Sequence, residues 1–280
     1  MQGMATPCPY CRGLALPNPS ARIPKNLMRI LGVLNHKGGT GKTTTVVNLA
    51  SGLAMRGARV LIIDLDAQGS VATSLGISYT SGLPQLMLGA ARLENCIYPA
   101  RDNLDIIPSD RKLMEVEGML WQMNDRTAAR QFLSQTMEPL SGYDYVVIDY
   151  SPSASLLGQS GLLFSDELLV PVSMDYMALM GTRQVIETLK EIGRIPDHHL
   201  RLSLIVPTFY YGRLRKDREV LTALHRYFNG KVADPIRSNV KVAEAPGHHQ
   251  TIYEYAPRSI GAKDYAQLVE RIADDGTKSR

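Results

Sequence analysis

The residues of this chain with the clearest chemistry form a glycine-rich segment at positions 35–44, Asn-His-Lys-Gly-Gly-Thr-Gly-Lys-Thr-Thr. An apolar run precedes this segment and a helical pattern follows it, which is the arrangement of a phosphate-binding loop. In such a loop the backbone N–H groups point toward phosphate oxygens, Lys42 brings positive charge to the β- and γ-phosphates, and the Thr43 hydroxyl ligates Mg²⁺. We therefore predict a nucleoside triphosphate site formed by Lys37, Gly38, Gly39, Thr40, Gly41, Lys42, Thr43 and Thr44.

Acidic residues at the ends of two predicted strands are candidates for holding the magnesium ion and for orienting the attacking water. Asp64 and Asp66 follow a strand at 59–63, and their alternation places both carboxylates on the same side. Asp149 directly follows a strand at 145–148. Because a phosphate loop lies at the carboxyl edge of a parallel sheet, we expect all three acids beside it. Either Asp64 or Asp66 would orient the attacking water while the other helps to hold the magnesium shell, and Asp149 would stand at the metal.

Short apolar runs alternate along the chain with longer amphipathic stretches, a pattern typical of alternating strands and helices. Near-continuous apolar strands separated by helices predict an α/β fold, with a doubly wound, mostly parallel sheet flanked by helices. The predicted strands span 30–34, 59–63, 104–107, 145–148, 167–172 and 202–206. The predicted helices span 44–55, 111–123, 128–140, 177–192, 218–228 and 262–272.

Composition indicates one domain behind a short tail. The chain has 280 residues, of which 44% are hydrophobic. No apolar run approaches the roughly 18 residues of a membrane span. Residues 1–26 contain five prolines and lack the apolar core of a signal peptide. We therefore expect a flexible tail at 1–26, a single domain at 27–280 and a cytoplasmic location.

The tail contains a pair of cysteines, Cys8 and Cys11, separated by two residues. Three interpretations stay open: a disordered or partner-binding tail, half of a zinc site completed by another chain or a histidine, and a redox pair. The redox pair would need a strand before it and a helix after it, and the sequence shows neither. The histidine pairs at 198–199 and 248–249 are interpreted as surface or groove residues, because adjacent residues rarely chelate one ion together.

The formal net charge of +4 is unevenly distributed. Between residues 194 and 241, ten Lys and Arg residues face four acids, a net charge of +6 that leaves −2 for the rest of the chain. A localised basic excess is the usual footprint of a nucleic-acid surface, although a solvated basic face explains most single charge clusters. Charge alone leaves both interpretations open.

The phosphate loop departs from a strict Walker A motif in having His36 in place of Gly and a second lysine, Lys37. The form Lys-Gly-Gly-x-Gly-Lys-Thr resembles the deviant Walker A motif of the ParA/MinD superfamily. Within it, residues 64–70 resemble the switch I motif of the ParA/Soj partition ATPases, and residues 143–153 resemble their Walker B and switch II. Further similar segments lie at 170–172, 176–179, 207–210, 239–248 and 259–262, so the likeness extends from about residue 29 to 272.

This resemblance implies a P-loop ATPase that uses ATP and Mg²⁺ and forms a homodimer on ATP, in which Lys37 reaches the phosphates of the partner subunit. Its hydrolysis would be slow until a partner stimulates it. By the same resemblance the catalytic residues are Lys37, Asp66 as the hydrolytic acid, and Lys42. Pro207 joins the nucleotide-binding residues, Thr43 ligates Mg²⁺, and Asp64 and Asp149 act around the metal through water.

Three departures from the family pattern stand near these residues. Ala67 replaces the usual Pro, Ser70 replaces the usual Asn, and Tyr150-Ser151 replaces the usual Cys-Pro. None of them removes a charged group. We therefore expect altered rates rather than lost activity.

Other branches of the superfamily fit the chain less well. A MinD-like membrane protein would need a basic amphipathic C-terminal helix, an iron protein of the nitrogenase type would need a cysteine at Tyr150, and a large plasmid ParA would need a long N-terminal extension. The small Soj-like class remains, and it binds double-stranded DNA without sequence preference. The resemblance aligns its two phosphate-contacting residues with Arg213 and Lys241. Arg215, Lys216 and Arg218 are either secondary DNA contacts or a solvated face.

We therefore expect a nucleoid-associated ATPase that acts without membrane attachment. It would dimerise on ATP, bind DNA non-specifically in that state, and segregate or position a cargo through a ParB-like or other adaptor protein. The alternative is a protein-regulatory ATPase switch that recruits a partner to a protein assembly without binding DNA. The sequence does not identify the cargo, which an adaptor would choose.

Overall fold

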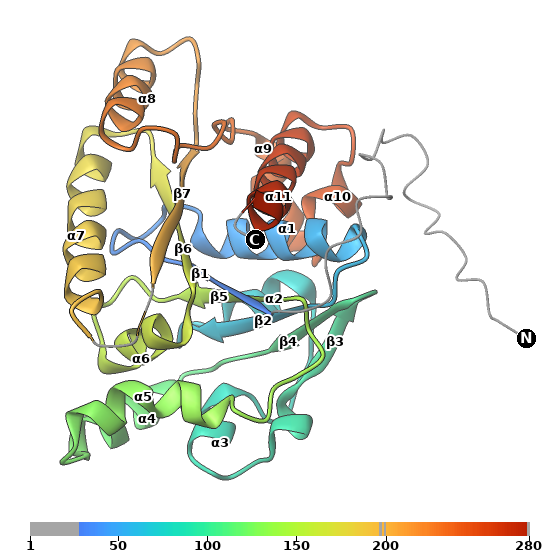
Figure 1. Ribbon diagram of the computed structural model, residues 1–280. Coiled ribbons are helices and arrows are strands. Elements are labelled where there is room, and N and C mark those ends of the chain that lie inside the picture. Colours follow the sequence, from blue (N-terminus) through green and yellow to red (C-terminus); the bar gives the residue numbers. More distant parts are fainter. Residues whose placement is uncertain (1–27, 196–197, 199, 279–280) are drawn as a thin grey trace, which may run out of the picture.

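A computed structural model describes residues 28–195, 198 and 200–278 of the chain (Figure 1). Its centre is a seven-stranded sheet in the order β3-β4-β2-β5-β1-β6-β7. Every neighbouring pair is parallel except β3 and β4, so the predicted mostly parallel sheet is confirmed. The strands are β1 (Arg29–Val33), β2 (Val60–Leu65), β3 (Tyr98–Arg101), β4 (Leu104–Ile107), β5 (Tyr145–Tyr150), β6 (Glu167–Ser173) and β7 (Arg201–Thr208).

Helices cover both faces of the sheet (Figure 1). One face packs against α1 (Lys42–Met55), α2 (Ser70–Leu75), α10 (Ile252–Tyr255) and α11 (Ile260–Lys278). The other packs against α3 (Leu83–Met87), α4 (Leu113–Gln122), α5 (Arg126–Thr136), α6 (Leu156–Phe164), α7 (Tyr176–Ile192) and α8 (Arg215–Tyr227). The remaining short elements are η2 (Leu93–Cys96), α9 (Val240–Glu244) and η3 (Ala245–His248). A sheet buried on both faces explains why its strands have near-continuous apolar sequences.

Two strand predictions were wrong at their carboxyl ends in a way that concerns the site. The predicted strands 59–63 and 145–148 continue to Leu65 and Tyr150, because the parallel ladder pairs Asp64 with Asp149 and Leu65 with Tyr150. Both acids therefore lie inside their strands and are buried, not in the turns that follow. Only Asp66 lies beyond the strand end.

Two helix predictions were also displaced. The helix predicted at 128–140 is α5, which starts at Arg126 because the Asp125 side chain accepts hydrogen bonds from the N–H groups of Thr127 and Ala128. The helix predicted at 218–228 is α8, which starts at Arg215. Arg215 and Lys216 thus belong to its first turn. The other predicted helices differ from the observed ones only at their ends.

Sequence patterns missed α6, which begins soon after β5. It is mostly apolar and short, so it lacks the amphipathic period by which the other helices were predicted. Its start is fixed from outside, because the Glu117 carboxylate on α4 accepts hydrogen bonds from the N–H groups of Leu156 (2.8 Å) and Leu157 (3.2 Å). The Ser155 hydroxyl adds a cap by accepting from the Gly158 N–H.

The Tyr150 side chain, at the end of β5, is buried in a space left by two glycines. Its hydroxyl and the Ser165 hydroxyl are hydrogen-bonded at 3.0 Å. A Cβ added at Gly32 on β1 would lie 2.9 Å from a ring carbon of Tyr150, and one at Gly161 on α6 would lie 2.8 Å from its hydroxyl oxygen. The tyrosine at position 150 is therefore accommodated by missing side chains on both neighbouring elements.

This packing predicts an interaction between positions 32 and 150. Gly32→Ala should lower the free energy of unfolding by about 1–3 kcal/mol, because an added methyl group overpacks the core. In a Tyr150→Cys background the smaller side chain relieves the closest contact, so the cost of Gly32→Ala should fall, while contacts with Ser165 (3.1 Å) and Leu168 (3.2 Å) keep part of it. Urea unfolding of the two single variants and the double variant measures both costs. Equal costs in the two backgrounds would contradict the proposed contact.

Candidate nucleotide and magnesium site

The predicted phosphate loop connects β1 to α1 and has the required backbone shape. Gly39 and Gly41 take left-handed conformations, with φ of 72° and 83°, which side chains disfavour. Gly38 and Gly39 are exposed, and α1 begins at Lys42. The free N–H groups at the start of α1 and the positive end of its dipole therefore face the loop, as anion binding requires.

Side chains on neighbouring strands and their loops hold this loop in place. The Asn35 amide donates to the Pro171 carbonyl on β6 (2.7 Å) and accepts from the Lys37 N–H (3.0 Å). The Thr208 hydroxyl at the end of β7 donates to the Thr40 carbonyl (2.9 Å). Sequence reasoning did not identify Asn35 or Thr208 as supports, because their partners are distant in sequence.

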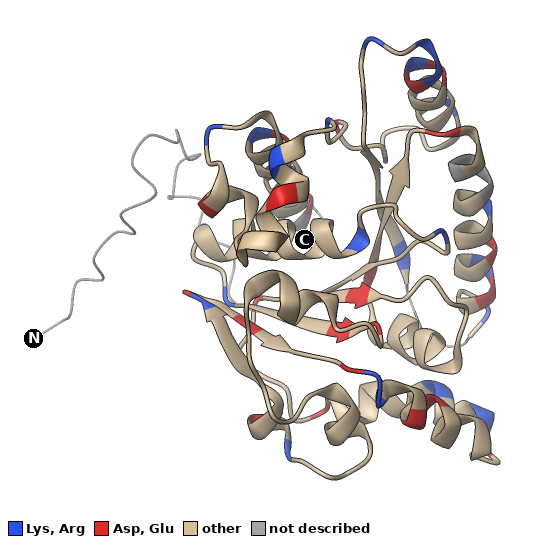
Figure 2. Ribbon diagram, turned by 180° about the vertical axis from the view of Figure 1, so that it is seen from behind, with Lys and Arg blue, Asp and Glu red and all other residues tan. Residues whose placement is uncertain are grey.

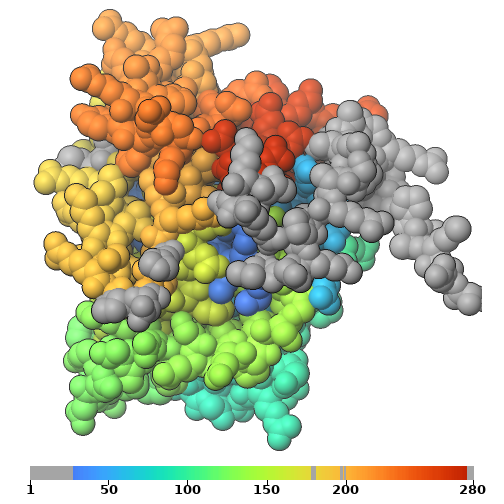
Figure 3. Space-filling view, in the orientation of Figure 1, coloured from blue at the N-terminus to red at the C-terminus, as the bar shows by residue number. Residues whose placement is uncertain are grey.

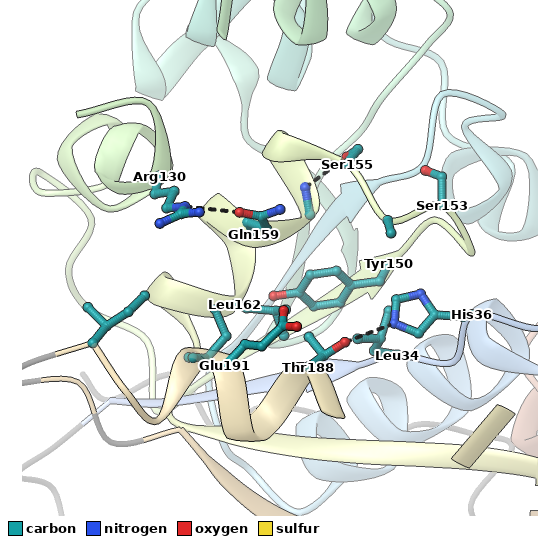
Figure 4. A pocket seen from close by; sticks show the side chains of 14 residues that line it. Leu34, His36, Arg130, Tyr150, Ser153, Ser155, Gln159, Leu162, Thr188 and Glu191 are labelled. Carbon is teal, nitrogen blue, oxygen red and sulfur yellow. Dashed lines mark hydrogen bonds between the residues drawn. The ribbon is translucent and has the colours of Figure 1, made fainter. Parts of the chain in front are cut away.

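The first residues of the loop also contact α7, beside a cavity of about 150 Å³ (Figure 4). His36 Nε2 lies 3.3 Å from the Thr188 hydroxyl, which itself donates to the Gln184 carbonyl. Tyr150 lines the same cavity, and on its far side Arg130 donates to the Gln159 amide oxygen (3.0 Å). The cavity thus separates the phosphate loop from the segment that follows β5.

The two lysines of the loop have different surroundings. Lys42 is buried, and its ammonium lies 3.4 Å from the Lys37 carbonyl. Burial lowers the pKa of Lys42, and the charges of Asp149 and Asp66 oppose this shift. The Lys37 side chain is about one-third exposed, and its ammonium lies 2.7 Å from both carboxylate oxygens of Asp175. Lys42 therefore points into its own loop, whereas Lys37 lies at the surface.

Asp149 lies where a magnesium ligand is expected. Its Oδ2 accepts a hydrogen bond from the Thr43 hydroxyl (2.7 Å), while its buried Oδ1 has no hydrogen-bond partner within the described residues. Burial raises the pKa of Asp149 to about 7, and the Thr43 hydrogen bond opposes that rise. Mg²⁺ in nucleotide sites typically uses one or two protein oxygens, phosphate oxygens and water. The Thr43 hydroxyl and the Asp149 carboxylate fit such an ion.

Asp64, the partner of Asp149 in the ladder, is fully engaged by the backbone. Its Oδ1 accepts from the Asp66 N–H (2.9 Å) and its Oδ2 from the Val71 N–H (3.2 Å). Burial and the nearby charge of Asp149 raise its pKa, against these two hydrogen bonds. In this arrangement Asp64 shapes the turn that carries Asp66. Its predicted role around the metal through water stays a prediction.

Asp66 is half-buried at the start of the loop between β2 and α2. Its Oδ1 accepts from the Gln68 N–H (3.0 Å), and within the described residues its Oδ2 has no hydrogen-bond partner. Its charge contributes to the raised pKa of Asp149, after burial, so the two carboxylates are close enough to interact. A carboxylate with one free oxygen beside the metal position is suited to orient a water molecule.

Pro207 is buried on β7 and takes part in the fold through its carbonyl, which accepts from the Ile236 N–H (2.8 Å). The strand leads directly to Phe209, which has a left-handed backbone and an exposed ring beside Gly41. The end of β7 therefore borders the phosphate loop. A contact of Pro207 with nucleotide stays a prediction.

The five basic residues predicted to contact DNA lie in two regions, a loop with the start of α8, and α9. The loop is joined to the chain before α9, because the Tyr210 N–H donates to the Ile236 carbonyl and the Ser238 N–H donates to the Tyr210 carbonyl. Figure 3 shows these segments together at one end of the molecule. All five residues are exposed: Arg213, Arg215, Lys216, Arg218 and Lys241.

Several of these cations have acidic partners. Arg215 pairs with Glu219, Lys216 with Asp217, and Lys241 with Glu244. Figure 2 shows the resulting mixture of basic and acidic residues along α8. Within the described residues the Arg213 and Arg218 side chains form neither a salt bridge nor a hydrogen bond. The +6 charge of this segment is thus partly compensated.

The tail cysteines Cys8 and Cys11, and His199, lie outside the described residues. His248 stacks on Tyr255, and His249 is hydrogen-bonded to the Thr73 carbonyl, which agrees with their interpretation as surface or groove residues. Within the described residues no group of three or more His, Cys, Asp or Glu side chains is arranged to hold a metal. None of the described helices combines the length and the apolar character needed to span a bilayer.

A family model described as an AAA domain matches residues 28–202. Over 246 residues the chain is 37% identical to the chromosome-partitioning ATPase Soj of Thermus thermophilus, a match that covers 88% of this chain and 95% of the relative. It is 32% identical over 252 residues to the chromosome partitioning protein ParA of Caulobacter vibrioides, covering 88% and 94%. The chain belongs to the ParA/Soj family of partition ATPases.

Solved structures agree with this membership. Cobyrinic acid a,c-diamide synthase from Mycobacterium smegmatis, solved with ADP and magnesium, has a TM-score of 0.78 at 26% identity, covering 91% of this chain and 97% of that one. MinD from Pyrococcus horikoshii, solved with Mg-ADP, has a TM-score of 0.73 at 25% identity, covering 88% and 96%. Cyanothece McdA has a TM-score of 0.79 at 20% identity, covering 88% and 100%, which shows a shared fold alone. The predicted fold class is confirmed.

Within this ParA/Soj chain, the free oxygen of Asp149 predicts a specific response to Mg²⁺. Asp149→Asn should remove most of the Mg²⁺-dependent gain in nucleotide affinity, roughly 10-fold or more, because a charge-assisted contact is worth about 1.5–3 kcal/mol. In metal-free buffer the same variant should unfold at an equal or higher temperature, since it removes a buried charge beside Asp64. Calorimetric titration and thermal unfolding measure the two effects.

The matched control for this pair of measurements is Asp234→Asn, at an exposed acid between α8 and α9. It should change neither quantity. A strongly destabilised metal-free Asp149→Asn protein would instead mean that Asp149 is a structural residue whose two oxygens are both needed by the fold.

Proposed function

We propose that this protein is an ATP-hydrolysing switch that dimerises on ATP, binds double-stranded DNA non-specifically in that state and positions a cargo through an adaptor. The observation that carries the proposal is the different placement of the two lysines in one phosphate loop. Lys42 is buried within its own loop, whereas Lys37 is at the surface, about one-third exposed. A partly exposed lysine beside a phosphate site can reach a second subunit once it leaves Asp175, its ion-pair partner.

ATP and Mg²⁺ are the proposed cofactors. The M. smegmatis and P. horikoshii structures hold ADP with magnesium, and the Thr43–Asp149 pair offers the corresponding oxygens. When bound, the metal would neutralise charge on the phosphates. The phosphate-contacting residues are proposed to be Lys37, Gly38, Gly39, Thr40, Gly41, Lys42, Thr43 and Thr44, with Pro207 near the rest of the nucleotide.

In the proposed hydrolysis Asp66 orients the attacking water through its free oxygen. Asp64 fixes the Asp66 N–H and the Val71 N–H, and so sets the position of the loop that carries Asp66. Lys42 stabilises negative charge that builds up on the phosphates. The basal rate is proposed to be slow, with an adaptor of the ParB type or another protein accelerating it.

Removing Lys42 and removing Lys37 should cause different defects. Lys42→Ala should weaken ATP binding by roughly 10- to 100-fold, because it loses a charge-assisted hydrogen bond worth about 1.5–3 kcal/mol. Lys37→Ala should retain most of the ATP affinity and remain monomeric, because its lost contact lies between subunits. Fluorescent-nucleotide titration and light scattering with ATP and Mg²⁺ separate the two defects. A Lys37→Ala protein that dimerises like the wild type would refute the proposed contact of Lys37 with the phosphates of the other subunit.

DNA binding is proposed to rest on Arg213 and Lys241, with Arg215, Lys216 and Arg218 as secondary contacts. Arg213 and Arg218 are exposed and unpaired within the described residues, which supports a role in contacting phosphates. In a dimer these residues would come from two subunits and would line one surface. The protein would then be nucleoid-associated in the cytoplasm while ATP is bound.

Arg213→Ala and Lys241→Ala should each weaken binding to all duplex sequences about equally and leave ATP-driven dimerisation intact. Each neutralised phosphate contributes about −0.9 to the slope of log K against log salt, so losing one cation from both subunits should flatten that slope by roughly 2. Gel shifts on arbitrary duplexes at several salt concentrations measure this slope. Arg226→Ala, at an exposed arginine near the end of α8, is the control.

The alternative function, a protein-regulatory ATPase switch without DNA binding, is supported by the paired cations. Within the described residues, five of the ten basic residues between 194 and 241 have acidic partners: Arg201, Arg215, Lys216, Arg237 and Lys241. Such pairing reduces the field available to a polyanion. Wild-type protein that retains no duplex at low salt with ATP, or retains it equally well with ADP, would favour this alternative.

A further inference from the structure

Lys37, the second lysine of the phosphate loop and the signature lysine of the deviant motif, is ion-paired within its own subunit. The Lys37 ammonium lies 2.7 Å from both Oδ1 and Oδ2 of Asp175. The Ser173 hydroxyl donates to Asp175 Oδ2 (2.8 Å), and the Asp175 N–H donates to the Ser173 carbonyl (2.8 Å). Asp175 is therefore held in a defined turn, and it presents its carboxylate to Lys37.

This ion pair joins two segments that already pack against each other. Asp175 lies in the turn between β6 and α7, and β6 is hydrogen-bonded to the loop through Asn35 and the Pro171 carbonyl. On α7, a Cβ added at Gly181 would lie 3.0 Å from Asn35 Oδ1 and 3.7 Å from the Lys37 Cβ. His36 and Thr188 add a further contact to α7. These contacts therefore hold the Lys37 side chain against its own subunit.

We propose that Asp175 is a positioning residue that holds Lys37 within its own subunit and so opposes ATP-dependent dimerisation until a partner's phosphates replace it. This inference rests on the proposed function, in which Lys37 contacts the nucleotide of the other subunit. To make that contact the ammonium must leave the Asp175 carboxylate. The carboxylate then keeps the Ser173 hydroxyl and gains water.

The size of the effect follows from the exposure of the pair. The Lys37 and Asp175 side chains are 35% and 40% exposed, so solvent screens their attraction substantially. Pairs of this exposure contribute modestly to stability, which corresponds to a change of about 1.5- to 5-fold in an equilibrium constant, and we take about 3-fold for each pair. Two signature lysines are exchanged per dimer, so removing the pair should shift the dimerisation constant by roughly 10-fold. The ion pair therefore raises the protein concentration at which the dimer forms and does not prevent dimerisation.

The test compares a variant that removes the charge at position 175 with one that keeps it. Asp175→Asn retains a hydrogen-bond acceptor for Ser173 and removes the charge that holds Lys37. With Mg²⁺ and a non-hydrolysable ATP analogue, it should dimerise at a roughly 10-fold lower protein concentration than the wild type. Its nucleotide affinity, measured well below the dimerisation range, should stay within about 2-fold. Asp175→Glu, which keeps the charge, should restore the wild-type threshold at least in part.

Glu187→Gln is the matched control on α7, because it breaks the exposed pair with Arg183 and leaves Lys37 untouched. It should not change the dimerisation constant. Sedimentation velocity gives that constant for every variant, and thermal unfolding reports whether each one is folded. If Asp175→Asn is too unstable to measure, Ser173→Ala, which only loosens Asp175, should shift the threshold in the same direction by a smaller factor.

The outcomes separate the inference from the proposed function. If the wild type does not dimerise with the ATP analogue, the proposed function fails. If the wild type dimerises and a folded Asp175→Asn protein dimerises equally or more weakly, the positioning role of Asp175 is wrong while the proposed function stands. Ser173→Ala, if that variant has to be used, decides between the same two outcomes.

Discussion

The parallel pairing of β2 with β5 places two buried carboxylates side by side. Much of the surrounding site supplies the hydrogen bonds and positive charge that these carboxylates need. Asp64 and Asp149 are opposite each other in the ladder, and burial raises the pKa of both. Backbone N–H groups satisfy Asp64, but Asp149 receives only the Thr43 hydroxyl within the described residues. A buried acid with an unfilled oxygen is unfavourable for a fold by itself. It is well suited to a site that a cation completes.

The positive half of this arrangement comes from the phosphate loop, which the sheet holds on more than one side. Asn35 attaches the loop to β6, Thr208 attaches it to β7, and α1 begins at Lys42. The loop therefore needs little rearrangement to receive phosphates, and a pre-ordered site loses less conformational freedom on binding. The buried Lys42 of this loop also depends on the acids opposite it, because burial lowers its pKa and the charges of Asp149 and Asp66 oppose that shift.

Sequence reasoning predicted the parts of this site that are local in the chain. The spacing of glycines and lysines identified the loop, the apolar runs identified six of the seven strands, and the acids at strand ends identified Asp64, Asp66 and Asp149. It failed where a role depends on residues distant in sequence. No local pattern distinguishes Asp175 or Glu117 from any other acid. Their contacts with Lys37 and with the first N–H group of α6 form only when β6 and α4 are placed beside the loop and α6.

Sequence left the meaning of the basic segment open for a related reason. A basic segment in sequence is not a basic surface, because acids elsewhere can neutralise it. Arg201 pairs with Glu167 on β6, and Arg237 pairs with Asp264 on α11, partners that no window around residues 194–241 would include. Arg213 and Arg218 are unpaired in the described residues, so the basic character is concentrated on fewer positions than the composition indicates.

The segment between β5 and α6 is fixed at both ends. Tyr150 closes one end, with its ring enclosed by Gly32 and Gly161, and the Glu117 carboxylate holds the first N–H groups of α6 at the other. Only residues 151–155 connect these two anchors. Any change of backbone shape between the two anchors is therefore confined to residues 151–155. α6 itself cannot slide along its axis without breaking the hydrogen bonds of its cap, so the two anchors resist movement of the helix and leave the connection as the adjustable part.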